Sequence, residues 1–128
     1  MTAALLTMRG TLMSNFKIKN GLQASALGQG AVSVSGTDVD LSLGTYFSKT
    51  ISGATTLTFS NPPLSGFGQT FQIEITGDGS AITWPTSIDW DRATTPPVTA
   101  SGKVDVFNFL TVDNGTSYVG KKTIEGAS

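Results

Sequence analysis

The chain of 128 residues contains no cysteine and no histidine. Without cysteine there are no disulfides and no thiolate metal sites, and without histidine the commonest general base and transition-metal ligand is missing. Only 13% of the residues are charged and the formal net charge is −1, so the basic patch typical of a nucleic-acid-binding protein is also missing. We therefore expect no cofactor, no bound metal and no nucleic-acid partner.

Long apolar runs are absent as well. The run at 3–6 has no basic residue before it and ends before Arg9, far short of the roughly 20 residues that a membrane-spanning helix needs. We expect neither a signal peptide nor a membrane partner. Met1, Met8 and Met13 are alternative starts, and the sequence does not choose between them.

Alternation of apolar and polar residues is the dominant pattern from residue 31 onward. This period of two is the signature of half-buried β-strands, and no segment favours a helix. The pattern predicts strands within 31–36, 38–43, 45–51, 55–60, 70–76, 81–84, 103–112 and 117–124. We predict an all-β fold, an antiparallel β-sandwich or jelly roll over residues 31–122, with an N-terminal arm at 1–30 and a C-terminal tail at 123–128.

Two glycine-containing stretches are predicted to be hairpin turns. "GDGS" at 77–80 connects two expected strands, and "DNGT" at 113–116 carries the Asn-Gly pair that tolerates the positive φ angles of a type I′ turn. The stretch 104–112 is apolar on both faces, which is typical of a central strand covered on both sides. The residues expected in the core are Phe47, Leu57, Phe59, Phe71, Ile73, Ile75, Trp84, Val106 and Phe109.

Carboxylates are the only plausible catalytic groups. Glycoside hydrolysis needs two of them facing one cleft, and calcium binding needs several converging oxygens. The candidates are Asp38, Asp40, Glu74, Asp89, Asp91 and Glu125. Solvated strand faces and turn caps explain them more simply, so we predict no catalytic residue and no enzymatic activity. Trp90, flanked by charges, suits either the edge of the core or a platform for a sugar ring.

The first 30 residues lack the strand pattern but are rich in apolar side chains. These are Leu5, Leu6, Leu12, Phe16, Ile18, Leu22 and Leu27. Each would contribute about 1.5–3 kcal/mol if a partner buried it, before ordering costs are subtracted. We interpret this segment as an attachment arm.

Two long stretches carry a resemblance to a known family. They are "YFSKTISGATTLTFSNPPLSGFGQTFQIEITGDG" and "ITWPTSIDWDRATTPPVTASGKVDVFNFLTVDNGTSYVG". Their order resembles a β-sandwich module common in virion proteins of tailed bacteriophages, cyanophages among them. The matching positions are Phe59, Ser60, Asn61, Pro62, Thr83, Trp84, Pro85, Ser87, Trp90, Lys103, Asp105, Val106, Phe107, Phe109, Asp113, Gly115 and Thr116. The match covers about residues 45–120, and Tyr118 departs from it because a tryptophan is frequent there.

The resemblance implies a structural role in a virion and carries over no catalytic residue. In that family the module often ends a long fibre, whereas this chain begins only about 45 residues before it. We therefore expect a capsid decoration (cement) protein on the capsid surface, whose arm binds the major capsid protein or identical copies. The family also suggests a homotrimer. The alternatives are a small tail or fibre subunit, an adhesin that binds host-surface glycans, and a carbohydrate-binding module outside the virion.

Overall fold

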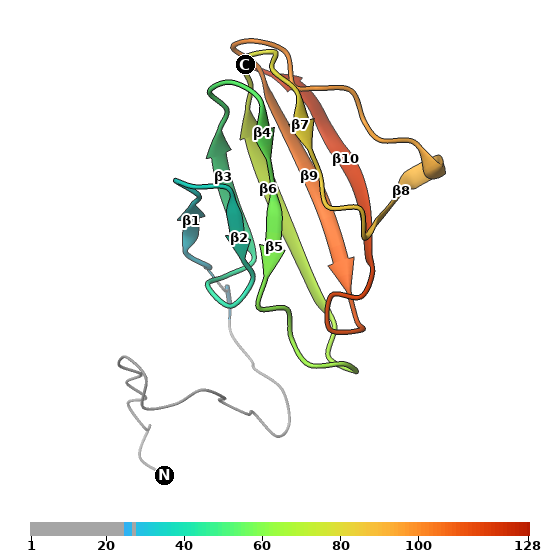
Figure 1. Cartoon of the computed structure of the whole chain (residues 1–128). Helices are drawn as coiled ribbons and strands as arrows, with labels where there is room; N and C mark the ends of the chain where they lie inside the picture. The colour runs from blue at the N-terminus through green and yellow to red at the C-terminus, as the bar shows by residue number, and fades with distance from the viewer. Residues whose placement is uncertain (1–24, 27) are drawn as a thin grey trace.

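A six-stranded mixed β-sheet forms the framework of the protein (Figure 1). The computed structural model describes residues 25, 26 and 28–128, so the predicted arm residues Leu5, Leu6, Leu12, Phe16, Ile18, Leu22 and Leu27 lie outside the described residues. The strands are β1 (Ala31–Ser33), β2 (Asp38–Asp40), β3 (Tyr46–Thr50), β4 (Thr55–Thr56), β5 (Thr58–Ser60), β6 (Gln69–Thr76), β7 (Ile82–Thr83), β8 (Ile88–Trp90), β9 (Val104–Thr111) and β10 (Tyr118–Ala127). The short 3-10 helix η1 spans Asp91–Ala93. Within the described part of the chain, no helix is long and apolar enough to span a bilayer.

The large sheet has the strand order β1-β3-β6-β9-β10-β8. Two further parallel pairs, β2–β5 and β4–β7, lie over one face of this sheet (Figure 1). Only Leu57 separates β4 from β5, and its N–H donates to the carbonyl of Thr83 at 2.9 Å. The covering strands therefore continue one another in a second layer.

The expected antiparallel pairing is wrong for most of the fold. Only β6–β9 and β9–β10 are antiparallel, whereas β1–β3, β3–β6, β8–β10, β2–β5 and β4–β7 are parallel. The reason is that the chain from β1 to β7 passes back and forth between the sheet and the layer above it, with β4 and β5 both in that layer. Strands that are neighbours in the sheet are thus joined by a full crossover, which returns the chain in the same direction.

The predicted hairpin at 77–80 is also wrong. This stretch leads from β6 in the sheet to β7 in the covering layer. Its Asp78 carboxylate accepts the N–H groups of Gly53 and Ser80, at 2.7 and 2.8 Å. These hydrogen bonds anchor a crossover between layers, and they lower the pKa of Asp78 below its ordinary value.

The predicted turn at 113–116 is confirmed. It joins the antiparallel strands β9 and β10, and Asn114 and Gly115 have φ angles of 59° and 73°. The Asp113 carboxylate accepts hydrogen bonds from the N–H and hydroxyl of Ser117, which lower its pKa. The expected C-terminal tail at 123–128 is wrong, because β10 continues to Ala127 and pairs with Val104 at its end.

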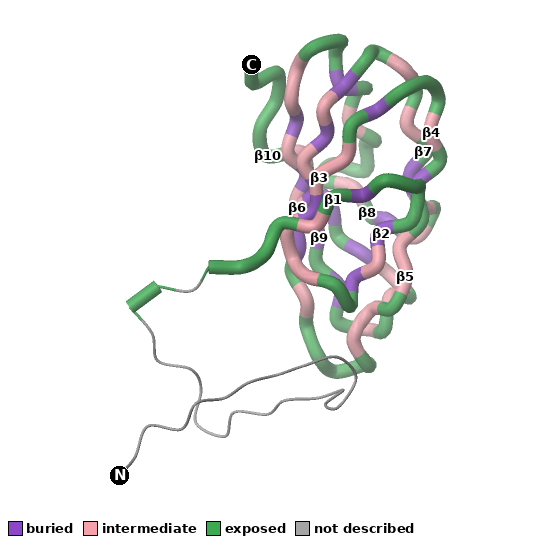
Figure 2. The backbone as a smooth tube through the Cα atoms, turned by 90° about the vertical axis from the view of Figure 1, so that its left-hand side faces the viewer, coloured by how far each residue is buried: buried purple, intermediate pink, exposed green. Residues whose placement is uncertain are grey.

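The core lies between the sheet and the covering strands (Figure 2). Of the residues expected there, Phe47, Leu57, Phe71, Ile73, Ile75, Trp84 and Phe109 are buried, and Phe59 is half-buried against them. Val106 is a wrong assignment, since β9 turns Asp105, Phe107 and Phe109 inward and leaves Val106 half-buried on the opposite face.

This phase of β9 buries Phe107 and Phe109 and also places a buried ion pair beside them. The Nζ of Lys122 lies 2.8 Å from Oδ2 of Asp105, and the two side chains are only 8% and 2% exposed. Lys122 also donates to the carbonyl of Pro97 at 3.0 Å, and the N–H of Gly126 donates to Asp105 Oδ1 at 2.8 Å. Burial alone would raise the pKa of Asp105, but the hydrogen bonds from Lys122, Gly126 and Thr99 outweigh it and the pKa is lowered. Asp105 is therefore a charged group inside the core.

Replacing Lys122 by methionine should destabilise the fold by about 3–5 kcal/mol, because the Asp105 carboxylate would stay buried without its partner. The matched control is Lys121→Met, since Lys121 is the exposed neighbour on the same strand and its loss should cost less than about 0.5 kcal/mol. Denaturant unfolding followed by tryptophan fluorescence measures both variants. Equal free energies of unfolding would contradict a structural role for the pair.

Candidate functional site

Four large apolar side chains are exposed in the links at one end of the sheet. Leu43, Leu64, Phe67 and Val112 have exposed fractions of 63%, 69%, 61% and 55%. They belong to the β2–β3, β5–β6 and β9–β10 links, at 41–45, 61–68 and 112–117. We call these three links the arm-side end.

Strand direction places these links together. The parallel strands β1, β3 and β6 begin at one end of the sheet, and the antiparallel strand β9 finishes there. A hydrogen bond of 2.9 Å from the N–H of Gly66 to the carbonyl of Val112 joins two of the links. The side-chain amide of Gln69 donates to the carbonyls of Leu41 and Gly44, both at 3.0 Å, and joins the third. Because residue 30 leads directly into β1, the N-terminal segment leaves from the same end (Figure 1).

The sequence analysis did not single out this surface. The signal available was apolar residues inside a stretch rich in glycine and proline, "NPPLSGFGQ" at 61–69. Contiguous apolar patches on a protein surface mark interaction sites more often than scattered single residues do. The four exposed apolar side chains at one end of the sheet therefore make the arm-side end a candidate interaction surface.

A second candidate is a groove of about 460 Å³ beside the two tryptophans. Its lining residues are Ile82, Thr83, Trp84, Pro85, Thr86, Ile88, Trp90 and Thr95. The ring centroids of Trp84 and Trp90 are 5.4 Å apart, with an interplanar angle of 78°. Trp90 also packs edge-on against Phe109 at 5.7 Å, so much of its indole supports the core. The exposed part, with three threonines around it, is what a sugar ring would contact.

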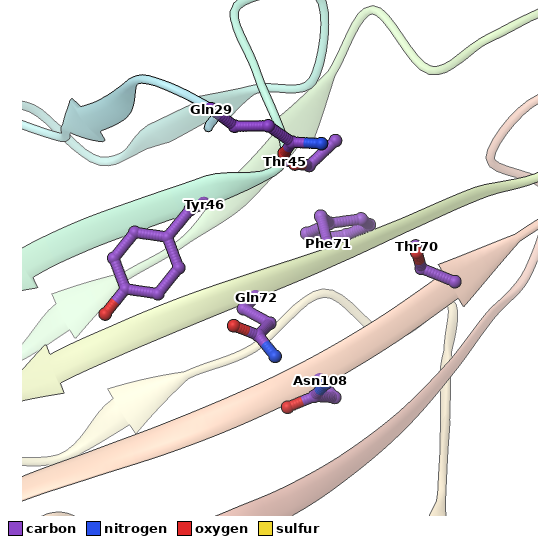
Figure 3. Close-up of a pocket in the computed structure, with 7 residues that line it drawn as sticks. All are labelled: Gln29, Thr45, Tyr46, Thr70, Phe71, Gln72 and Asn108. Carbon is purple, nitrogen blue, oxygen red and sulfur yellow. The ribbon is translucent and has the colours of Figure 1, made fainter. Parts of the chain in front are cut away.

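A third hollow, of about 410 Å³, lies on the uncovered face of the sheet (Figure 3). Tyr46, Gln72 and Asn108 are register partners across β3, β6 and β9, so their side chains form one row there. Gln29, at the root of the N-terminal segment, also lines this hollow. The Tyr46 hydroxyl donates to Glu74, and this bond raises the tyrosine pKa. The row offers amide and hydroxyl groups to a polar partner.

The carboxylates considered as catalytic or metal-binding groups do not converge. Asp38 accepts hydrogen bonds from Thr58 and Ser60, and Asp40 accepts them from Ser42 and Asn61, which lower the pKa of Asp40. Asp89 and Asp91 are exposed on and after β8, at the other side of the fold. The Glu74 carboxylate accepts a hydrogen bond from the Tyr46 hydroxyl, and Oε1 of Glu125 lies 3.7 Å from Nζ of Lys122. Among residues 25, 26 and 28–128, no three acidic groups gather as a metal site would require.

Many residues of the quoted motifs pack against one another. A Cβ atom at Gly115 would lie within 2.5 Å of the Tyr118 hydroxyl and 2.8 Å of Pro62, so the hairpin closes directly on the "SNPP" corner. Phe59 packs edge-on against Tyr118 with ring centroids 5.0 Å apart. Asn61 adopts a left-handed conformation, with φ of 52°. The motif thus joins a corner, a hairpin and the aromatic core.

Comparison with known proteins gives no relative: neither a family model, nor a curated protein, nor a solved structure matches this chain.

The tryptophan groove yields a test of its own. Trp84 is 9% exposed, and its ring centroid lies 4.8 Å from that of Phe107. Trp84→Ala should therefore lower the free energy of unfolding by about 3–5 kcal/mol. Trp90→Ala, at a half-buried position, should lower the free energy of unfolding by clearly less. Denaturant titration compares the two variants, and a glycan array probes binding in both. If Trp84→Ala unfolded like the unsubstituted protein but lost glycan binding, Trp84 would be a ligand platform instead of a core residue.

Proposed function

We propose that this protein is a non-enzymatic structural protein of a tailed-bacteriophage virion, with capsid decoration as its role. Its N-terminal arm binds the major capsid protein, and the arm-side end sits against the capsid surface. The observation that carries this proposal is the gathering of Leu43, Leu64, Phe67 and Val112 at the end from which the N-terminal segment leaves. An arm and an apolar surface at one end form a single attachment region.

The family resemblance supplies the second line of support. Gly115 of the β9–β10 hairpin packs on Pro62, and Trp84 and Trp90 pack on each other and on Phe109 of β9, as expected of a module defined by its packing. In fold terms, we propose that β2–β5 and β4–β7 form the second layer of a β-sandwich. This assignment requires no reaction and no cofactor.

A symmetric assembly suits this attachment. We propose a homotrimer, in which three copies related by a three-fold axis present their arms at the same end. Each copy then holds the same orientation relative to the capsid, and three arms bind more tightly than one because their effective concentration is high. The opposite end, where the chain terminates, points away from the capsid.

The Trp90 groove favours a second candidate function. An indole surrounded by threonine hydroxyls is typical of glycan recognition, which would suit a tail or fibre subunit that acts as an adhesin. Copy number separates the two roles. Quantitative gel densitometry of purified virions should find hundreds of copies per particle for a decoration protein, and a handful would favour the tail.

Deleting residues 1–28 should leave the β fold intact and abolish binding to particles depleted of the protein. The physical reason is that every described strand begins at or after Ala31, whereas the arm supplies the apolar side chains for the partner. Circular dichroism measures the fold, and co-sedimentation with depleted particles measures attachment.

The matched variant is deletion of the last residue, Ser128, which follows the end of β10 and should leave attachment unchanged. Normal attachment of the arm-deleted protein would move the binding site to the arm-side end alone. A failure to fold would show that the arm is a strand of the core.

A further inference from the structure

The arm-side end exposes apolar side chains to water in the free protein, which is energetically unfavourable. Its four apolar side chains are each more than half exposed, and they lie in links that hydrogen bonds hold together. Burying even part of such a surface is favourable, by roughly 25 cal/mol for each Å² of apolar area removed from water. A cover is therefore expected whenever the virion partner is absent.

The N-terminal segment of the same copy is the cover that lies within reach. Residue 30 leads into β1 at this end of the sheet, and ten residues of extended chain span at most about 33–36 Å. A tethered segment binds as though it were present at roughly millimolar concentration. Neither a second copy nor a foreign protein has this advantage at ordinary protein concentrations.

Charge also matches the segment to the surface. All nine acidic residues of the chain lie after residue 30, whereas Arg9, Lys17 and Lys19 lie before it. The three links contain Asp113, adjoin Asp40 and have no lysine or arginine. Both carboxylates are ionised at neutral pH, as an aspartate ordinarily is, and their hydrogen bonds lower the pKa of each further.

The sequence of residues 15–22 matches both the apolar side chains and the carboxylates of the arm-side end. In "NFKIKNGL", the apolar residues Phe16 and Ile18 alternate with Lys17 and Lys19, and Leu22 follows. An extended chain with this alternation presents one apolar edge and one basic edge. The apolar edge matches the four exposed side chains, and the basic edge matches the two carboxylates.

We propose that residues 16–22 dock on the arm-side end of their own copy in the free protein, and that the virion partner displaces them. The arm and the apolar end then cover each other until attachment, when both become available together. This inference deepens the proposed attachment function and rests on it for its biological meaning. The docking itself is a property of the isolated chain.

The absence of native cysteine allows a direct test by disulfide formation in the full chain. Asn20→Cys places a thiol in the arm, and Ser65→Cys places one in the exposed β5–β6 link without removing an apolar side chain. Under mild oxidation, this pair should close an intramolecular disulfide at least tenfold faster than the control pair, Asn20→Cys with Ser101→Cys. Ser101 is exposed just before β9, at the opposite end of the sheet.

The control thiol lies within full extension of the arm, because the eight residues of β9 span about 27 Å and ten extended residues span at most about 33–36 Å. A flexible chain of ten residues has an end-to-end distance of only about 16–19 Å, so proximity alone favours the first pair, and the decisive comparison is the first pair with and without Phe67→Ser. Non-reducing electrophoresis distinguishes a faster-migrating monomer from a dimer, and circular dichroism verifies that each variant is folded. Adding Phe67→Ser to the first pair should bring its rate toward that of the control, because it removes part of the apolar surface.

Three results would overturn the proposal. Equal rates for the two pairs would show that the arm does not prefer this end, and a dimer as the main product would assign the surface to the arm of a second copy. An unchanged rate with Phe67→Ser would separate the docking from the apolar side chains. No particle enters this experiment, so its failure would leave the deletion test of attachment unaffected.

Discussion

The need to cover the inner face of a six-stranded sheet with a narrower second layer governs this structure. The pairs β2–β5 and β4–β7 provide fewer strand positions than the sheet beneath them, so other groups must cover the inner faces of β9 and β10. Trp84 does so at 4.8 Å from Phe107 and 5.6 Å from Phe109, and Trp90 extends the same cluster. The two tryptophan side chains thus cover the part of the sheet that the covering strands do not reach. Their positions on either side of Pro85 bring both indoles into this one cluster.

The aromatic cluster is covered by different groups at its two ends. At the far end, Lys122 pairs with Asp105 and its Nζ lies 5.6 Å from the ring centroid of Phe107. At the arm-side end, Tyr118 covers Phe59 and Phe71, and the hairpin packs on Pro62. The arm-side end carries four exposed large apolar side chains, whereas the link that precedes β9 carries one, Val98.

Local patterns in the sequence predicted local features well. Alternation located the strands and most of the buried residues, and Asn114–Gly115 identified the hairpin between β9 and β10. Pairing partners were not predictable, because a period of two says which face is buried but not which strand lies alongside. Val106 was assigned inward because 104–112 is apolar on both faces, which leaves the phase of the strand undetermined. In the inward phase Asp105 pairs with Lys122, which lies 17 residues away in the sequence, and no local pattern records such a pair.

The candidate site was harder to predict because it consists of links. Leu43, Leu64, Phe67 and Val112 belong to three separate segments, and the shared direction of β3 and β6, with the opposite direction of β9, brings those segments to one end. The links from β1 to β7 alternate between the two ends, because each crossover from one strand of the sheet to the next has one link at each end. Strand direction therefore decides which links share an end, and strand direction is also what a period of two does not record.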